Sequence, residues 1–205
     1  MIKKVTIAEK IMKAKNSIRE TEEMARLKKE HSINEGVVFI SGDAVEFGRK
    51  LLVHKKVSMI VPSDIANMDI ISAEVKYQEP RPDFIYICEG TLIHILFSVE
   101  VSEDNESLET VKDELVQEMR DEGSEVLSEG VLESESGKVP FLSFNNQAID
   151  RMMHNVVFFL LVENRLVVGT INFDSGKMEV LEPVVKQMLE SIYIEPVKQR
   201  KKMVW

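Results

Sequence analysis

Cysteine is nearly absent from this chain of 205 residues, and Cys88 is its only thiol. A single cysteine cannot form an internal disulfide, and the sequence has neither a CxxC motif nor a Cys/His pair at zinc-binding spacing. A domain of about 200 residues buries roughly 70% of the surface that its unfolded chain exposes. The fold therefore needs neither a disulfide nor a structural metal for its stability.

Long hydrophobic runs are absent too. The longest one, residues 156–162, is far shorter than the roughly 20 apolar residues that a membrane-spanning helix needs. The N-terminus carries lysines but has neither an apolar core nor a small-residue cleavage site, which argues against a signal peptide. We therefore expect a cytoplasmic protein without a membrane span.

Motifs that mark catalytic or cofactor sites are missing as well. The nine glycines are scattered and form no phosphate-binding loop, and no serine lies in a GxSxG motif. Cys88 could act as a nucleophile with His94 as its base, and His94 could form a metal or catalytic pair with His154. On apolar strands, however, thiols and imidazoles more often pack as ordinary core residues. We expect no enzyme activity, no cofactor and no metal.

Charge is abundant but unevenly distributed around a net charge of −9. Residues 100–135 contain fourteen acidic residues against only Lys112 and Arg120, whereas residues 1–30 contain nine basic residues against five acidic ones. No compact basic face with interleaved aromatic residues is present, so we expect no binding to nucleic acid. The acidic stretch is typical of a solvated surface that keeps a protein soluble.

The first element that the sequence predicts is a helix from Ile7 to His31. Thr6 and Glu9 have the spacing of a capping box, and the apolar residues that follow recur at helical spacing in a thin stripe. This helix could pack on its own domain or pair with a second copy in a homodimer. The side chains that we expect to contact a partner are Ile7, Ile11, Ile18, Met24 and Leu27.

β-Rich runs separated by turn residues follow the N-terminal helix. Residues 107–122 interrupt them with an amphipathic helix, for which Ser107 is the expected N-cap and Gly123 the expected C-terminal stop. Glu163 and Asn164 join the last two strands in an expected tight hairpin. The expected strand regions are residues 37–40, 50–62, 73–78, 83–90, 91–101, 124–134, 138–150, 153–162 and 165–173.

Two of these strands carry apolar residues on both faces, one of them throughout, and this bears on the architecture. Within residues 156–162 both the odd and the even positions are apolar, and residues 91–101 have one fully apolar face and a mixed one. A strand that is apolar on both faces needs cover on both faces, and the amphipathic helices are the available covers. We predict an α+β fold, a three-layer α/β/α sandwich with a mostly antiparallel sheet, plus an extra N-terminal helix.

The last helical stretch contains Pro183. Its apolar stripe continues to Ile192 with helical spacing. Proline is tolerated at the first position of a helix, where its missing N–H is not needed. We therefore predict a short turn over residues 178–181, a helix that begins at about Pro183, and a structural role for this proline. Asp174 and Ser175 are expected to end the preceding strand.

The closing stretch VVGTINFDSGKMEVLEPVVKQMLESI resembles the final strand and helix of the PsbP-like superfamily, which includes the photosystem II P subunit, Ran-release factors and DcrB-type proteins. VSMIVPSDI is similar to the opening strand of that family, and FLSFNNQ followed by NVVFFLLVENRLVVGTINF to its central strands. The resemblance covers roughly residues 51–196. Leu181 stands where the family commonly has tryptophan, and residues 7–31 have no counterpart there.

The resemblance implies the same α/β/α fold and a binding or assembly role without a shared active site. We expect an N-terminal helical extension over residues 1–35, a PsbP-like domain over 36–197 and a basic tail over 198–205. The main functional hypothesis is a non-catalytic protein-binding or chaperone-type protein. A second is small-molecule or lipid binding in a pocket between sheet and helix. A third is an enzyme in which His94, His154 and a carboxylate converge.

Overall fold

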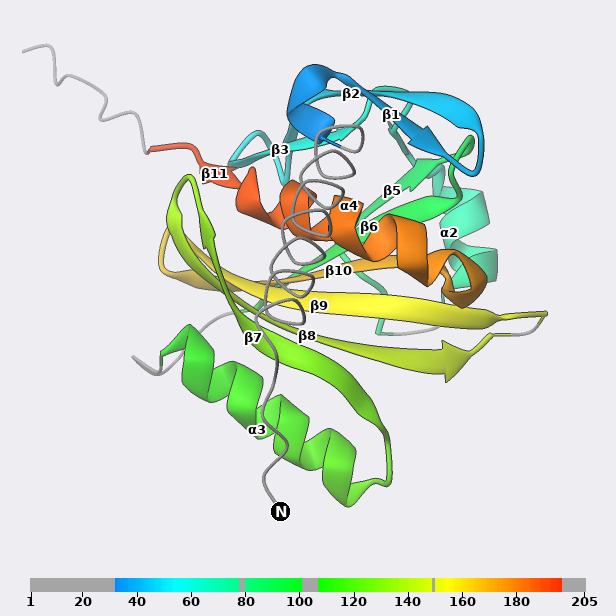
Figure 1. The fold of residues 1–205 in the computed structure, drawn as a ribbon. Helices are drawn as coiled ribbons and strands as arrows, with labels where there is room; N and C mark the ends of the chain where they lie inside the picture. The colour runs from blue at the N-terminus through cyan, green and yellow to red at the C-terminus, as the bar shows by residue number, and fades with distance from the viewer. Residues whose placement is uncertain (1–31, 78–79, 101–106, 149, 197–205) are drawn as a thin grey trace, which may run out of the picture.

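A computed structural model of the chain describes residues 32–77, 80–100, 107–148 and 150–196. It contains two antiparallel sheets, which are packed against each other and against three α-helices (Figure 1). The smaller sheet has the strand order β1-β2-β3-β11. Its strands are β1 (Val37–Ile40), β2 (Asp43–Leu52), β3 (Val57–Pro62) and β11 (Tyr193–Ile194).

The larger sheet has seven strands in the order β4-β5-β6-β10-β9-β8-β7. All of its neighbouring strands are antiparallel. The strands are β4 (Ala66–Asn67), β5 (Phe84–Cys88), β6 (Ile93–Glu100), β7 (Val126–Ser134), β8 (Gly137–Gln147), β9 (Met152–Val162) and β10 (Arg165–Asp174).

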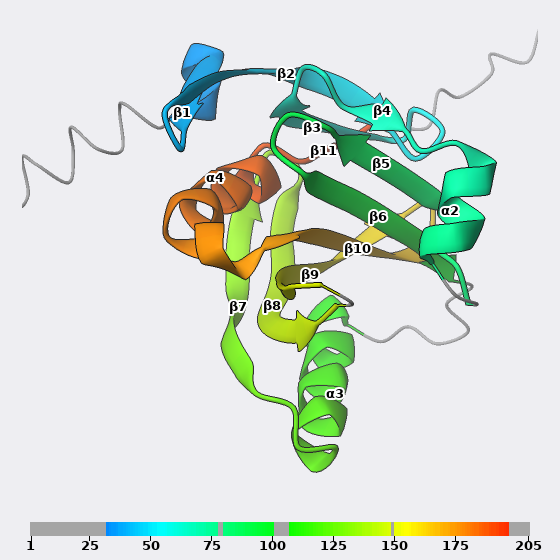
Figure 2. The same ribbon diagram turned by 90° about the vertical axis from the view of Figure 1, so that its right-hand side faces the viewer.

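Helices cover both faces of the larger sheet, as Figures 1 and 2 show. The face on which α2 and α3 pack is called the α2/α3 face below, and the opposite one the α4 face. The α4 face is also covered by the smaller sheet, and together they enclose the main hydrophobic core. The helical segments are η1 (Ile33–Glu35), α2 (Ile70–Lys76), α3 (Leu108–Asp121), η2 (Ser175–Lys177) and α4 (Met178–Glu190).

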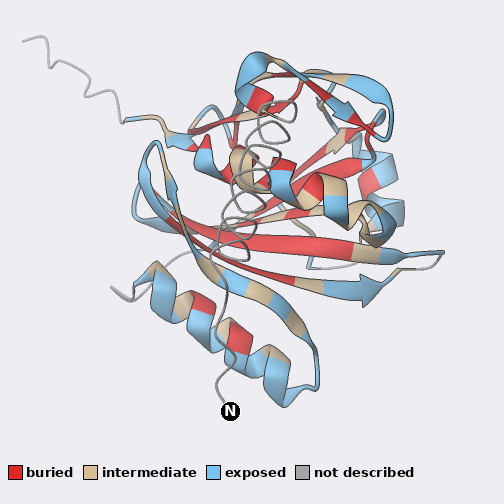
Figure 3. Cartoon of the chain, in the orientation of Figure 1, coloured by how far each residue is buried: buried red, intermediate tan, exposed pale blue. Residues whose placement is uncertain are grey.

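The central strands are buried on both sides, as their double apolar pattern predicted. Phe158 on the α4 face of β9 and Phe159 on its α2/α3 face have 0% and 1% of their surface exposed. Figure 3 shows these strands in red between helices whose outer faces are pale blue. The positive φ angles of Glu163 (51°) and Asn164 (61°) confirm the tight hairpin between β9 and β10.

Helix α3 begins and ends where its sequence predicts. The Ser107 hydroxyl accepts a hydrogen bond from the Thr110 N–H at 3.1 Å, which satisfies one of the free donors of the first turn. Gly123 lies just beyond the helix with φ at +82°, a conformation that glycine adopts without strain. The helix packs on β8 and β9 through Val116, Leu142 and Val157.

The start of α4 differs from the prediction. The helix begins at Met178 rather than near Pro183, and Pro183 lies inside it. Proline removes the backbone hydrogen bond to the carbonyl of Glu179, but both residues are exposed. Water can therefore hydrate that carbonyl, and the proline is tolerated in the second turn.

Of residues 73–78, which were expected to be a strand, residues 73–76 instead form the last part of α2 and Tyr77 is its C-cap. The alternation of Ala73, Val75 and Tyr77 is typical of a strand, but Asp69 caps a helix here. Of these three residues, Ala73 and Tyr77 pack against the sheet and Val75 does not. A second, smaller sheet was not expected. Residues 50–62, expected to be one strand, contain the end of β2 and all of β3 with a turn between them, and β3 also pairs with β11, which is distant in sequence. The antiparallel α+β character is confirmed.

The predicted helix over residues 7–31 and the basic tail over 198–205 lie outside the described residues, so the helical extension and the tail stay predictions. The three-layer α/β/α description stays a prediction as well. Ser32 and Ile33 are where the described chain begins, and the Ile33 N–H donates a hydrogen bond to the Gln187 side chain of α4 at 3.1 Å. Among the described helices, none has the length and hydropathy needed to cross a membrane.

Candidate functional site: the surface around α2

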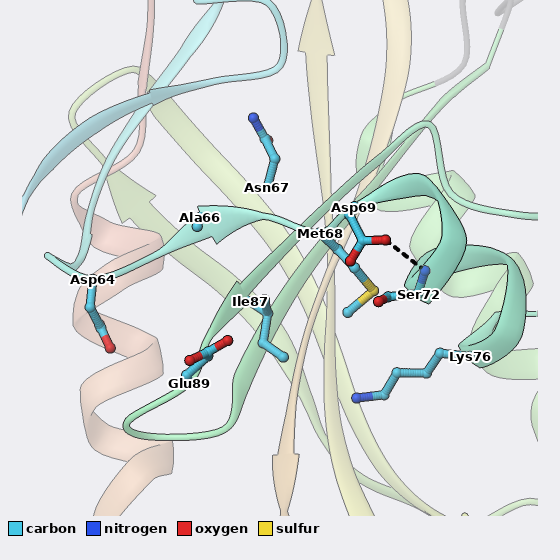
Figure 4. Close-up of a pocket in the computed structure, with 9 residues that line it drawn as sticks. All are labelled: Asp64, Ala66, Asn67, Met68, Asp69, Ser72, Lys76, Ile87 and Glu89. Atoms are coloured by element: carbon cyan, nitrogen blue, oxygen red, sulfur yellow. Dashed lines mark hydrogen bonds between the residues drawn. The ribbon is translucent and has the colours of Figure 1, made fainter.

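Helix α2 lies on the larger sheet near its β4 edge and is only seven residues long. Its first turn is capped by Asp69, whose carboxylate accepts a hydrogen bond from the Ser72 N–H at 3.0 Å (Figure 4). Hydrogen bonding to Ser72 lowers the pKa of Asp69 below its usual value, because it stabilises the charged carboxylate. The inner side of the helix packs on β5 and β6 through Ala73, Ile85 and Leu96.

The outer side of α2 carries three large aliphatic residues that contact little else. Ile70 and Ile71 each have 74% of their surface exposed, and Val75 has 84%. Ile71 and Val75 are four residues apart, so they lie on one side of the helix, whereas Ile70, next to Ile71 in sequence, projects from an adjacent side of its first turn. These three side chains are called the α2 patch. Exposed apolar groups in a contiguous patch are typical of an interaction surface.

A pocket of ≈ 580 Å³ lies beside the α2 patch, between α2, β4 and β5. Figure 4 shows Asp64 and Glu89 at one end of this pocket and Lys76 and Ser72 at the other, with Ile87 between them. We call it the α2 pocket. Its full lining is Asp64, Ala66, Asn67, Met68, Asp69, Ser72, Lys76, Ile87 and Glu89.

The α2 pocket has more negative than positive charge. Three of its lining residues are acidic and Lys76 is its one basic residue. The Asp64 carboxylate accepts hydrogen bonds from the Cys88 thiol at 2.8 Å and from the Gly90 N–H at 3.3 Å. Neither Asp64 nor Glu89 forms an ion pair with another described residue. The pocket therefore favours a cationic group.

Cys88 is fully buried at 0% exposure and donates its S–H to Asp64, so it packs as a small core residue. Burial raises the pKa of this thiol, and the hydrogen bond that the thiol donates to the Asp64 carboxylate raises the pKa further. Cys88 points to the α4 face and His94 to the α2/α3 face, because consecutive positions of a strand alternate and Cys88 pairs with Ile93. The two cannot act as a nucleophile and its base.

His94 instead forms a polar cluster under the C-terminal end of α2. Its Nδ1 lies 2.7 Å from the Tyr77 hydroxyl and its Nε2 lies 3.2 Å from the Lys76 ammonium. Burial, with a smaller contribution from Lys76, lowers the pKa of His94 to about 4. Burial also raises the pKa of Tyr77 to about 12.

The neutral His94 ring has a defined tautomer when Lys76 carries its charge. An ammonium can only donate, so Nε2 must accept from Lys76, and Nδ1–H then donates to the Tyr77 oxygen. Burial, together with the nearby Arg151, lowers the pKa of Lys76. The hydrogen bonds of this cluster attach the end of α2 to β6, so the cluster positions the helix.

His154 lies on the other side of the sheet. His94 pairs in register with Asn172, and Asn172 pairs with Asn155, so His154, the next residue from Asn155, points to the opposite face. There its Nδ1 lies 2.8 Å from the Asn145 side-chain oxygen and its ring 5.1 Å from that of Phe173. Burial lowers the pKa of His154. The convergence of His94 and His154 that an enzyme would require does not occur.

No three His, Cys, Asp or Glu side chains come together to hold a metal ion in the part of the chain that the structure describes. The predicted contact residues Ile7, Ile11, Ile18, Met24 and Leu27 lie outside the described residues. Sequence reasoning missed the α2 patch. The sequence did contain a signal for it. Asp69 is a favourable N-cap residue, and the aliphatic residues after it do not recur at the spacing of a buried helix face.

The chain matches no protein-family model and no curated protein by sequence. Its fold is similar to that of the cyanobacterial PsbP protein CyanoP from Synechocystis sp. PCC 6803, with a TM-score of 0.51 and 8% identity over 73% of this chain and 92% of that one. At this identity the similarity shows the fold alone. The PsbP-like resemblance predicted from the sequence is thus confirmed for the fold.

Two further solved structures are similar at lower scores. PA94, a protein of unknown function from Pseudomonas aeruginosa, has a TM-score of 0.44 and 10% identity, over 74% of this chain and 99% of that one. LpqN of Mycobacterium tuberculosis, which is involved in cell envelope biogenesis, has a TM-score of 0.41 and 11% identity, over 78% of this chain and 90% of that one.

Proposed function

We propose that this protein is a non-catalytic binding protein that holds a partner protein on the α2 patch and the adjoining α2 pocket. The observation that carries this proposal is the exposure of Ile70, Ile71 and Val75 on a helix attached firmly to the sheet. Burying one such side chain fully against a partner stabilises a complex by about 1.5–3 kcal/mol. The patch therefore provides favourable binding energy at a small, fixed surface.

The adjoining charges define the chemistry of the partner. The patch is aliphatic, and the α2 pocket beside it has three carboxylates against one ammonium group. A complementary partner segment presents aliphatic side chains to the patch and a lysine or arginine to the pocket. Charge complementarity of this kind supplies specificity and speeds association more than it adds affinity.

The PsbP-like fold is compatible with this role, because a fold carries many functions and function lies in the site built on it. We also propose that the predicted N-terminal helix contributes a second contact through its stripe Ile7, Ile11, Ile18, Met24 and Leu27, either to the partner or to a second copy in a homodimer. Residues 198–205 would add a basic contact. A cytoplasmic location remains part of this proposal.

The experiment that tests the proposal is a quantitative affinity capture from native lysate with three full-length baits. The wild type is compared with Ile71→Asp/Val75→Asp, which places two charges on the α2 patch, and with Leu161→Asp as a matched control. Leu161 is 51% exposed on β9, two strands away from β6, on which α2 packs. The proposal predicts a protein that the wild type and the control retain and the α2 variant does not.

A second set of baits lacks residues 1–31, which leaves the buried Ile33 and its hydrogen bond to Gln187 in place. Loss of the same protein from this truncated bait would assign a contact to the N-terminal helix, whereas its retention would assign binding to α2 alone. Retention of the same proteins by the α2 variant and the wild type would refute the role of the patch.

A second candidate function is binding of a small molecule in the α2 pocket, which the opposite charges at its two ends favour. The pocket volume of ≈ 580 Å³ lies in the usual range for small ligands, about 300–1,000 Å³. A ligand with separate positive and negative groups would match Glu89 and Lys76. Glu89→Lys would abolish binding of such a small molecule. It would not affect binding of a partner protein that contacts only the aliphatic α2 patch.

A further inference from the structure

A second pocket lies at the other end of β5, remote from the α2 patch. Phe84 at the start of this strand lines it, whereas Ile87 near its end lines the α2 pocket. The pocket has a volume of ≈ 580 Å³ and is formed where the turn between β2 and β3 meets the hairpin of β9 and β10. We call it the turn pocket.

The inner surface of the turn pocket is apolar. Val53, Val162 and Val167 line it and have between 1% and 5% of their surface exposed. Phe84 and Val99 complete this wall and are half-buried. A wall made of valines and one aromatic ring binds hydrocarbon groups in preference to water.

The turn that forms the rim has an unusual backbone. Val53, His54 and Lys55 have φ angles of 48°, 52° and 66°, so three consecutive non-glycine residues adopt the left-handed conformation. This conformation is unfavourable for L-residues and above all for a β-branched valine. Conformations of this kind persist where the surrounding structure holds them, and they are concentrated at binding sites.

Specific contacts hold the turn in place. The Val53 N–H donates a hydrogen bond to the buried Tyr86 hydroxyl at 3.1 Å, and the Lys56 N–H donates to the Leu52 carbonyl at 3.1 Å. His54 then lies edge-on to the Phe84 ring, with ring centroids 4.7 Å apart and an angle of 89°. The strained turn thus fixes His54 at the rim of the apolar wall.

The lining of the turn pocket carries two cations, Lys56 and Arg165, and two carboxylates, Asp83 and Glu163. Lys56 forms an ion pair with Glu163. The Asp83 carboxylate accepts a hydrogen bond from the Val99 N–H at 2.7 Å, which engages it with the backbone of the wall. Within the described part of the chain, Arg165 forms no ion pair, and it is one of the residues that line the pocket. Its planar donors suit the two oxygens of a carboxylate.

We propose that the turn pocket binds a small carboxylate with an aliphatic or aromatic body. The body packs on Val53, Val162, Val167 and Phe84, the carboxylate pairs with Arg165, and His54 lies beside it at the rim. This site is separate from the α2 patch, and its occupancy does not depend on the proposed partner protein.

The test is a titration of the full-length protein with octanoate, followed by two-dimensional amide NMR, and a parallel titration with 1-octanol. We expect saturable shifts for the amides of His54, Phe84, Val99 and Arg165 with octanoate. Arg165→Gln should weaken octanoate binding about tenfold or more and leave octanol binding unchanged, because a charge-assisted pair is lost. Arg120→Gln, which changes a distant arginine bound to Glu129, should alter neither.

A second variant tests the apolar wall. Val99→Phe adds bulk to a half-buried position and should abolish shifts from both probes, and its amide spectrum also shows whether the fold is intact. The proposal is overturned if the wild type shows no saturable shifts at the turn pocket. It is equally overturned if Arg165→Gln weakens octanoate and octanol alike, or if Val99→Phe with a native spectrum still binds octanoate as the wild type does.

Discussion

His94 and His154 lie on opposite faces of the larger sheet, although their strands are separated only by β10. The side-chain alternation of a strand has a period of two, so the register of β6, β10 and β9 decides which residues share a face. His94 therefore belongs to the cluster that attaches α2, and His154 packs on Phe173 beneath α4.

The low pKa of His94 predicts a loss of stability in acid. Its pKa is about 4 in the folded protein against 6.5 when unperturbed, so the unfolded chain binds the proton more readily. Stability from this residue is complete above pH 6.5 and is lost as the pH falls toward 4. The difference corresponds to at most roughly 3 kcal/mol.

Urea unfolding of the wild type and of His94→Gln between pH 7.5 and 4.5 measures this effect. The variant should lose less stability than the wild type as the pH falls. His154→Gln serves as the comparison, since burial lowers the pKa of His154 in the same direction. Parallel pH dependence of wild type and His94→Gln would show that His94 is not the group responsible.

Gly169 allows the Phe158 ring to pack across β10. A Cβ atom at position 169 would lie 2.1 Å from Phe158 Cζ, a distance that no relaxed structure permits. Gly169→Ala should therefore lower the free energy of unfolding by about 3 kcal/mol, at the upper end of overpacking effects. Thermal denaturation measures this change.

Two controls distinguish the clash from a general effect of alanine in the sheet. Gly130→Ala, whose Cβ would lie 3.3 Å from the Phe141 ring, should cost much less. Phe158→Leu should destabilise the wild type but should cost less in the Gly169→Ala background. If Phe158→Leu costs the same in both backgrounds, the two residues are not coupled.

Cys88 should be inert in the folded protein. It is fully buried, and burial together with Asp64 raises its pKa, so both access and thiolate formation are suppressed. A thiol reagent such as DTNB should react with it only at the rate of unfolding, and completely in guanidinium chloride. Rapid labelling of the native protein would contradict the described packing of β5.

Local sequence signals predicted much of the fold. The caps of α3 at Ser107 and Gly123, and the hairpin at Glu163 and Asn164, depend on short-range geometry, and each occurs as expected. The double apolar pattern of residues 156–162 correctly indicated cover on both faces. These features depend on neighbouring residues alone.

What the sequence could not provide were pairings between distant segments. Strand β11 joins the smaller sheet because Tyr193 and Ile194 pair with Ser58 and Val57, and nothing in either segment specifies the other. The last part of helix α2, residues 73–76, was mistaken for a strand because its apolar residues alternate with a period of two. The α2 patch is an exposed surface, and an exposed surface leaves no core pattern to detect.

The most direct test of the account is a photo-crosslinking amino acid placed at position 71 in the full-length protein and irradiated in its native cells. The same residue at position 161 is the control, since Leu161 is exposed on β9. We predict one dominant crosslinked protein from position 71, absent from position 161. Weak and identical crosslinking from both positions would contradict the proposal that α2 holds a partner.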